Sequence, residues 1–338
     1  MNDNRPFTFV DPFDEGEQAL GTETRLAEFE IGSNEDGTSG SEISLCVLSC
    51  INVGRIKKLS EIEQLAMHTV ESLDFVIDNQ AYPVKAAEKM LKRRSIGVGI
   101  TNLATYLAKK KVSYEDKEAL VYVDELAEHI QFYLIKASVQ LAKERGPCEW
   151  FHKTKWAKGI LPIDTYHKNV DNLVKRELTL DWEWLRAEIL EHGMRNSVLS
   201  CQPPVESSSV VQNATNGIEP IRNLVSIKKS KSSIIKQVVE SPKLPYTHAW
   251  EMYSNKGMIN IAAVIQKYWC QAISLNTYIN PGNIMKYDSP DDLELSEVVD
   301  DIMHAYTHGI KTMYYNNLND GKTDEDDAGG CESGACSV

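Results

Sequence analysis

The segment ISLCVLSCINV, Ile43–Val53, is the first part of the chain with the character of a protein core. An unbroken apolar run of this length is typical of a strand buried on both faces, as in a parallel sheet. A second run, SIGVGITNL at Ser95–Leu103, has alternating glycines that would let neighbouring backbone or a ligand approach closely. Similar runs predict three more strands, at Asn196–Cys201, Ala272–Ile279 and Ile310–Asn316.

Helical patterns separate these strands. Ser60 and Glu63 have the spacing of a capping box at the start of a helix that continues to Ile77. Residues 116–145 form a long helical pattern that stops at Gly146. We expect further helices at 182–191, 260–271 and 295–308, and a hairpin at 224–239. Five short strands separated by helices predict an α/β fold of parallel βα units, either an open sheet or half of a closed barrel.

The charge of the chain lies mainly at its two ends. The net charge is −13, yet residues 1–42 hold 11 acidic and 2 basic side chains, and residues 320–338 hold 6 and 1. We therefore interpret 1–41 as a flexible acidic extension, 42–318 as the folded domain and 319–338 as a flexible tail. The middle is almost neutral, with no basic run longer than Lys228–Lys231, so nucleic-acid binding is not expected.

The apolar runs and the cysteines indicate the compartment. No apolar run approaches the roughly 20 residues that cross a bilayer, and the N-terminus lacks a signal-peptide pattern. The odd count of seven cysteines argues against a secreted disulfide framework. We expect a cytoplasmic protein without a membrane partner.

The C-terminal sequence CESGACSV carries the clearest chemical signal. Cys331 and Cys336 lie five positions apart among glycines on an acidic segment, so they could form a shuttling dithiol. An incidental pair of exposed cysteines is the alternative, and a metal site is a distant third because no histidine lies nearby. The other cysteines, Cys46 among them, read from the residues alone as small buried hydrophobes.

Two further patterns allow a functional or a purely structural interpretation. In PPVESSSVVQNATNG, residues 203–217, the side chains after the prolines occupy a helix start that could bind phosphate or could simply cap the helix. Tyr314 and Tyr315 could pass a radical between adjacent rings, although paired tyrosines more often only pack.

Six motifs together resemble the large subunit of class I ribonucleotide reductases. In order, they are LCVLSCINVG, RRSIGVGITNLA, GILPIDTYHK, ESSSVVQNATNGIEP, GIKTMYYNN and CESGAC, and the similarity runs from about Glu42 to Val338. The resemblance implies a ten-stranded α/β barrel made of two five-stranded halves. The five strands expected here would be its second half.

The resemblance also implies roles for particular residues. Cys46 matches one of two active-site cysteines that become a disulfide when a ribonucleoside diphosphate is reduced, and Cys331 and Cys336 match the dithiol that re-reduces them. Thioredoxin or glutaredoxin would in turn reduce this dithiol. Tyr314 and Tyr315 match the pair that relays a radical from the small subunit. The substrate diphosphate would bind at Glu206, Ser207, Ser208 and Ser209.

The resemblance leaves essential parts unaccounted for. The family's thiyl-radical cysteine and second active-site cysteine lie upstream of the strand that matches Cys46, and residues 1–41 contain no cysteine. We therefore expect one piece of a split large subunit, inactive without an N-terminal partner chain and the small subunit. A split gene of this type would fit a phage, and the protein would then act in the host cytoplasm. The iron site and stable radical would belong to the small subunit, so no metal is expected here.

Three other interpretations stay open. The chain could be a non-catalytic fragment that binds and regulates the reductase. It could be an independent thiol oxidoreductase, although it lacks the C-x-x-C of thioredoxin-like enzymes. It could also belong to a cobalamin-dependent or glycyl-radical relative of the same barrel.

Overall fold

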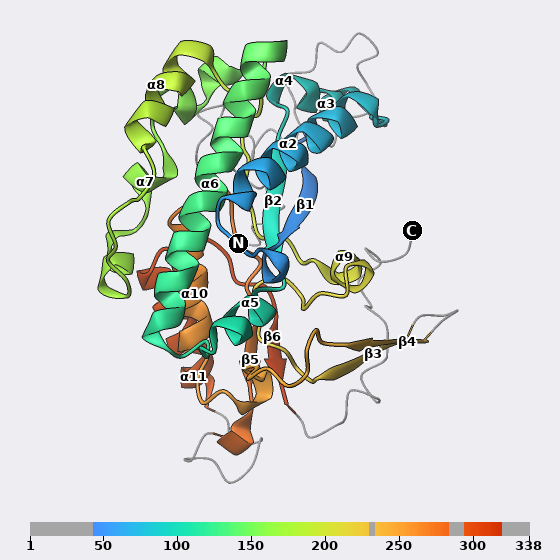
Figure 1. The fold of residues 1–338 in the computed structure, drawn as a ribbon, viewed down its shortest axis with the longest axis vertical. Coiled ribbons are helices and arrows are strands. Elements are labelled where there is room, and N and C mark those ends of the chain that lie inside the picture. Colours follow the sequence, from blue (N-terminus) through green and yellow to red (C-terminus); the bar gives the residue numbers. More distant parts are fainter. Residues whose placement is uncertain (1–42, 230–233, 284–293, 320–338) are drawn as a thin grey trace, which may run out of the picture.

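The structure is a computed structural model that describes residues 43–229, 234–283 and 294–319 (Figure 1). Its strands are β1 (Val47–Asn52), β2 (Ile96–Thr101), β3 (Val225–Lys229), β4 (Ile234–Val238), β5 (Thr277–Ile279) and β6 (Asn316–Leu318). Its α-helices are α2 (Glu61–Asn79), α3 (Lys85–Glu88), α4 (Met90–Arg93), α5 (Leu103–Lys110), α6 (Lys117–Arg145), α7 (Pro162–Thr165), α8 (Trp182–His192), α9 (Glu206–Val211), α10 (Lys256–Gln266) and α11 (Leu295–Thr307). The α/β class is therefore confirmed. The predicted 1–41 extension and 319–338 tail lie outside this range, apart from Asn319.

Two parallel pairs of strands are joined by extended segments. β1 pairs with β2 in register from Val47↔Ile96 to Asn52↔Thr101, and β5 pairs with β6. Residues 198–202 continue from β2, because Val98 N donates to Leu199 O at 2.8 Å. Residues 272–275 follow, because Ser274 N donates to Gln202 O at 2.9 Å. These segments run in chain order, as expected for successive parallel βα units.

Five regular strands and a closed barrel are not found in the described residues. The segment predicted as the strand 196–201 forms only isolated bridges, such as Val98↔Ser200. The Gln202 side chain substitutes for part of the ladder, since its Oε1 accepts from Ile100 N at 2.9 Å and its Nε2 donates to Ile100 O at 2.8 Å. Pro203 and Pro204 follow and have no N–H to extend the pairing.

The last two predicted strands begin later than expected. β5 starts at Thr277, five residues after the predicted position, and β6 starts at Asn316, six residues after. Before β5 and β6 begin, side chains donate hydrogen bonds to backbone carbonyls that a regular strand pair would use. Thr312 Oγ1 donates to Ile273 O at 2.6 Å, and Lys311 Nζ donates to Cys270 O at 2.9 Å.

The helices agree better with the sequence. α6 ends before Gly146, whose φ of 81° explains the stop, and the predicted hairpin is the antiparallel pair β3–β4. The capping box at Ser60 is wrong, because Ser60 is already helical and its side chain makes no capping hydrogen bond. α10 covers 256–266 instead of 260–271.

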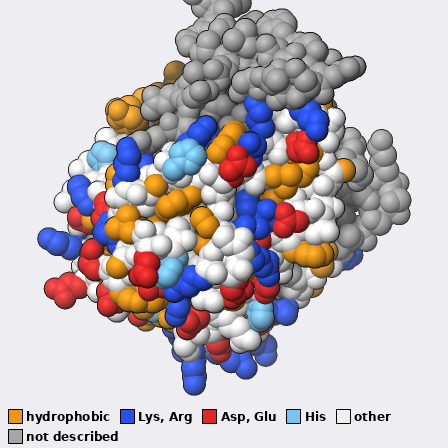
Figure 2. Space-filling model, turned by 90° about the horizontal axis from the view of Figure 1, so that it is seen from above, with side chains coloured by type: hydrophobic (Ala, Val, Ile, Leu, Met, Phe, Trp, Pro, Cys, Tyr) orange, Lys and Arg blue, Asp and Glu red, His pale blue; other side chains and the backbone are white. Residues whose placement is uncertain are grey.

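Long helices cover one side of the strands. α6 packs against α2, α8 and α10, and α2 and α6 lie beside β1 and β2, while the hairpin β3–β4 projects from the opposite side (Figure 1). On the face in Figure 2, acidic, basic and hydrophobic side chains are interspersed. Within the described residues, no helix is long and apolar enough to span a membrane.

Candidate active site

Strand β1 has one covered face and one open face. Ile51 is 4% exposed in the core beside α2, whereas Leu48 is 51% exposed. Because side chains alternate along an extended chain, Cys46 and Cys50 share the face of Leu48. A Cβ atom on Gly97 of β2 would lie 2.6 Å from Leu48 Cδ2 and 2.5 Å from Cys201 Sγ. A larger side chain at position 97 would clash with both neighbours. Glycine there lets the Cys201 thiol lie close to the face of β1 that carries Leu48, Cys46 and Cys50.

Cys46 lies at the beginning of this face. It directly precedes β1 and is exposed, which corrects the interpretation of it as a small buried hydrophobe in a strand. The ladder starts one residue later, where Val47 N donates to Ser95 O at 3.4 Å. Surrounding atoms nevertheless bury the thiol enough to raise its pKa, and nearby Cys270 adds to the rise. The Cys46 sulfur is therefore a protonated thiol at neutral pH.

Cys50 is a second thiol on the open face. Burial raises its pKa to about 12, although a backbone hydrogen bond with Gly99 opposes the rise. At neutral pH neither Cys46 nor Cys50 has the thiolate character of an activated nucleophile. The free thiols can still donate hydrogen atoms or electrons to a neighbouring radical or disulfide.

The segment proposed for phosphate begins the short helix α9. Glu206, Ser207 and Ser208 are exposed, whereas Ser209 is buried and donates its hydroxyl to Glu206 O at 2.6 Å. Glu206 has a φ of 34°, and its N–H donates to Asn216 Oδ1 at 3.1 Å. The exposed hydroxyls belong to Ser207 and Ser208, while Ser209 holds the turn together.

A polar network attaches this segment to the ends of β1 and β2. Asn102, with a φ of 69°, accepts at Oδ1 from Thr215 N at 3.0 Å and donates from Nδ2 to Asn52 Oδ1 at 2.9 Å. Arg55 donates to Gln212 O at 3.0 Å. The α9 segment is therefore held at the carboxyl ends of the strands.

The two tyrosines lie at the fifth extended segment. Tyr314 N donates to Leu275 O at 2.8 Å, and Tyr315 O accepts from Thr277 N at 2.8 Å. Both side chains are 50% exposed and they precede β6, which corrects the expectation of a pair at the end of a buried strand. The pair thus borders the segment 275–277, whereas Cys46 directly precedes β1. Cys331 and Cys336 are outside the described residues.

Comparison with known proteins identifies the family. The family model described as "Ribonucleotide reductase, barrel domain" matches residues 29–244 and 232–316. This chain belongs to the ribonucleotide reductase barrel-domain family. It is 47% identical over 303 residues to the ribonucleoside-diphosphate reductase subunit alpha of Haemophilus influenzae, covering 88% of this chain and 40% of that protein. The corresponding proteins of Escherichia coli (44% over 275 residues; 78% and 35% covered) and phage T4 (40% over 306 residues; 88% and 40% covered) are also similar.

This ribonucleotide reductase chain spans about 40% of the length of the first relatives that it matches. The match lies in their C-terminal part.

Sequence reasoning missed two residues that organise the site of this barrel domain. Asn102 and Gln202 are buried amides that connect the strands to the α9 segment. A signal existed for Asn102, because an asparagine between a strand and a helix is a frequent left-handed residue. Gln202 gives no such signal, since its role depends on a strand that lies far away in the sequence.

One group of side chains in this barrel domain has metal-ligand spacing. Glu188, Glu191 and His192 on α8 offer ligand atoms within 4.8 Å of one another, the only such group among the residues described. Glu188 already pairs with Lys143, and Glu191 is exposed. Acidic surface groups of this kind are common, so we assign no metal to it.

Proposed function

We propose that this chain is the C-terminal part of the large subunit of a ribonucleoside-diphosphate reductase and acts only in a complex. The complex would contain an N-terminal large-subunit chain and a radical-generating small subunit. The observation that carries the proposal is the open face of β1, where Cys46 and Leu48 are exposed and Cys50 is half-buried, in a chain of the barrel-domain family. An exposed apolar face of this kind calls for a covering partner.

The proposed reaction replaces the 2′-hydroxyl of a ribonucleoside diphosphate by hydrogen. The hydroxyl leaves as water, while Cys46 and a cysteine of the partner chain together give two electrons and two protons and become a disulfide. The Cys331–Cys336 dithiol then reduces this disulfide by thiol–disulfide exchange and is itself oxidised. Thioredoxin or glutaredoxin would restore the tail dithiol.

The substrate diphosphate would lie at Glu206, Ser207, Ser208 and Ser209. Ser207 and Ser208 offer exposed hydroxyls, and Ser209 fixes the turn that presents them. Glu206 is exposed beside them, and its carboxylate would repel a phosphate directly. We therefore expect Glu206 to contact a hydroxyl of the sugar or a bridging water.

Tyr314 and Tyr315 would relay the radical from the small subunit. Both residues are half exposed and therefore accessible to a partner chain. The iron and the stable radical would be held by the small subunit, and no metal is assigned to this chain.

Helix α11 supplies a surface for the small subunit. Its exposed side has an apolar stripe at helical spacing, consisting of Leu295, Val299, Ile302, Met303 and Tyr306. The other side packs on α10, where His304 Nε2 lies 2.7 Å from Asn260 Oδ1. An apolar stripe on a well-packed helix suits a partner segment that contributes a few hydrophobic side chains.

The test is a ribonucleoside-diphosphate reduction assay. The chain should be inactive alone and active when it is co-expressed with the N-terminal chain and mixed with the small subunit. Loss of this activity on Cys46→Ser would establish a catalytic role. A tight complex that shows no reduction would favour the regulatory fragment instead.

A further inference from the structure

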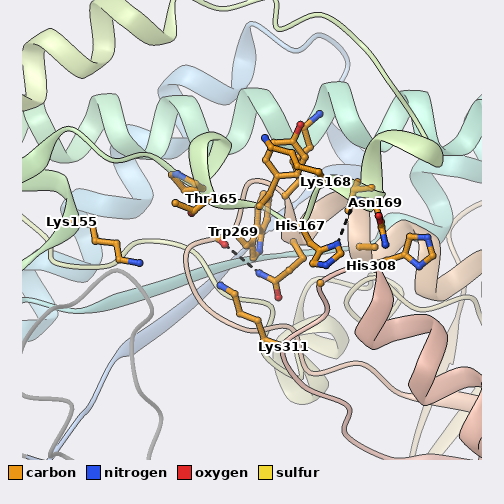
Figure 3. Close-up of a pocket in the computed structure, with 15 residues that line it drawn as sticks. Lys155, Thr165, His167, Lys168, Asn169, Trp269, His308 and Lys311 are labelled. Carbon is orange, nitrogen blue, oxygen red and sulfur yellow. Dashed lines mark hydrogen bonds between the residues drawn. The ribbon is translucent and has the colours of Figure 1, made fainter.

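The two tyrosines of the proposed relay lie on a segment that packing alone does not fix. Tyr314 and Tyr315 are both 50% exposed, so neighbouring side chains leave half of each residue uncovered. Hydrogen bonds hold the segment instead. At its start, Lys311 Nζ donates to Cys270 O at 2.9 Å, beside a cavity that Trp269 also lines (Figure 3). The attachment at the tyrosines themselves therefore decides how precisely the two rings are placed.

That attachment depends on one side-chain amide. Tyr315 N donates to Asn276 Oδ1 at 3.1 Å, where a regular strand pair would use a backbone carbonyl. The same amide donates from Nδ2 to Glu219 Oε1 at 2.5 Å. If the amide were turned over, Nδ2 would face the N–H of Tyr315 and Oδ1 would face the carboxylate, so both hydrogen bonds would be lost. Glu219 thus selects the orientation in which Asn276 can hold Tyr315.

Glu219 is itself held by a buried phenol. Tyr278, which is 4% exposed, donates its hydroxyl to Glu219 Oε2 at 2.5 Å. Both carboxylate oxygens therefore accept a hydrogen bond from the segment 276–278. Burial raises the pKa of Glu219, although the hydrogen bond from Tyr278 opposes the rise. The carboxyl group is largely withdrawn from water, so these two donors determine where it lies.

We propose that Glu219 positions the tyrosine pair for radical transfer by holding Asn276 against the backbone of Tyr315. The proposal rests on the proposed function, because it takes the pair as a radical relay. In the relay, a phenoxyl radical on one ring takes an electron and a proton from the other phenol, so that one ring is reduced as the other is oxidised. Reacting groups must be held within about 0.5 Å by the residues around them. Loss of the Glu219 contact should therefore slow this transfer.

Tyr278 anchors this arrangement and does not suit the transfer of the radical itself. Arg222 Cζ lies 5.3 Å from the centroid of its ring, and a cation there opposes the removal of an electron. Tyr278 N donates to Asn255 Oδ1 at 2.8 Å, and Asn255 Nδ2 donates to Asp301 Oδ2 on α11 at 2.7 Å. The hydrogen bonds that hold Tyr315 are thus anchored on the helix that we propose for small-subunit binding.

Two substitutions of Glu219 separate position from charge in the assembled complex. Glu219→Gln removes the charge and keeps the reach, since its Oε1 can accept from Asn276 and its Nε2 can donate to the oxygen of Tyr278. It should keep kcat within twofold. Glu219→Asp keeps the charge but withdraws the carboxylate by one methylene, and it should lower kcat at least tenfold without changing KM for the ribonucleoside diphosphate. Glu251→Asp, the same change at an exposed glutamate, is the matched control and should keep full activity.

Hydrogen–deuterium exchange of the full chain, resolved at single residues, measures the positioning without activity. The Tyr315 amide should exchange at least tenfold faster in Glu219→Asp than in the wild type or in Glu219→Gln, because it loses Asn276 as its acceptor. Asn276→Ala should have the same effect, and the two changes together should add nothing further. The Val98 amide, which donates to Leu199 O in another part of the fold, should not change.

Several results would overturn the positioning role. Equal losses of kcat in Glu219→Gln and Glu219→Asp would assign the effect to charge, and a raised KM would place Glu219 at the substrate. An unchanged Tyr315 amide, or a Val98 amide that accelerates equally, would show that Glu219 does not hold Tyr315 specifically. Failure of the proposed function looks different. No mixture would then reduce nucleotide, wild type included, while the Tyr315 amide would still respond to Glu219→Asp, so that Glu219 would hold the pair but the relay would be refuted.

Discussion

The rings of Tyr314 and Tyr315 lie with their centroids 4.1 Å apart and their planes inclined by 50°. The fourth extended segment fixes their backbone, since Leu275 O accepts from Tyr314 N and Asn276 Oδ1 accepts from Tyr315 N at 3.1 Å. Asn276 is in turn held by Glu219, whose Oε1 accepts from Asn276 Nδ2 at 2.5 Å. Two oxidisable rings in contact, on a backbone held this way, suit a radical relay.

Removal of either hydroxyl should stop turnover. We expect Tyr314→Phe and Tyr315→Phe each to lower nucleotide reduction by the assembled complex at least a hundredfold, because phenylalanine cannot form a phenoxyl radical. Binding of the partner chains, measured by sedimentation, should not change. Tyr253→Phe, at a tyrosine that is 72% exposed, is the control and should keep full activity. An active Tyr315→Phe enzyme would exclude the relay role.

The two cysteines on the open face of β1 should differ in function although they share its environment. Cys46→Ser should abolish reduction by the complex, whereas Cys50→Ser should retain most of it. Both wild-type thiols should react slowly with iodoacetamide at pH 7 and faster as the pH rises, since burial raises both pKa values. Rapid labelling of Cys46 at pH 7 would contradict a protonated thiol there.

The apolar stripe of α11 should determine affinity for the small subunit. Ile302→Ala with Met303→Ala should weaken binding at least tenfold, because the two changes remove several apolar groups worth about 0.8 kcal/mol each when buried. Glu297→Gln changes the same helix without shortening an apolar side chain and should leave binding unchanged. Titration calorimetry with the small subunit measures both. Equal affinities would show that the small subunit binds elsewhere.

Local patterns were sufficient for most of the helices and for the first two strands. The start at Glu61, the stop at Gly146 and the run around Val47 depend on residues near one another in the chain. The extended segments after residue 196 were harder to predict. In these segments the side chains of Gln202 and Thr312 donate hydrogen bonds to backbone carbonyls of distant segments, in place of backbone N–H groups. The strands are therefore shorter than the apolar runs predict.

The motifs predicted which residues form the candidate site, but the burial predicted for several of these residues was wrong. Cys46 and the tyrosine pair were expected to be buried because their runs are apolar, but the structure exposes them. Burial at these positions depends on which segments cover the strand, and an apolar run in the sequence does not show that. Ser209 differs in the opposite sense. It lies in a motif that suggested exposed phosphate-binding hydroxyls, but its hydroxyl is buried and donates to Glu206 O within the turn.

A buried thiol should make the stability of the chain depend on alkaline pH. Cys148 is 3% exposed, and burial raises its pKa to about 12 despite opposing arginines, whereas an unfolded thiol ionises near 8.5. Between these values the unfolded state binds fewer protons, so the free energy of unfolding falls as pH rises. The slope from this thiol approaches about 1.4 kcal/mol per pH unit. Urea unfolding at pH 8 and pH 10 should show a smaller fall for Cys148→Ala, and parallel falls would refute the assignment.

The contact between Gly97 and Cys201 offers a direct test of the open face. Gly97→Ala would place a methyl group 2.5 Å from Cys201 Sγ, and such overpacking should cost about 1–3 kcal/mol of unfolding free energy. Cys201→Ala removes that sulfur, so the double variant should be more stable than the sum of the single changes implies by at least about 1 kcal/mol. Leu48→Ala should give partial relief, because Leu48 Cδ2 is the second atom in the way. If Gly97→Ala is additive with Cys201→Ala and also with Leu48→Ala, β2 must be able to move away from its neighbours. The thiols of Cys46, Cys50 and Cys201 would then not share a fixed face, and the open side of β1 could not act as one wall of an active site.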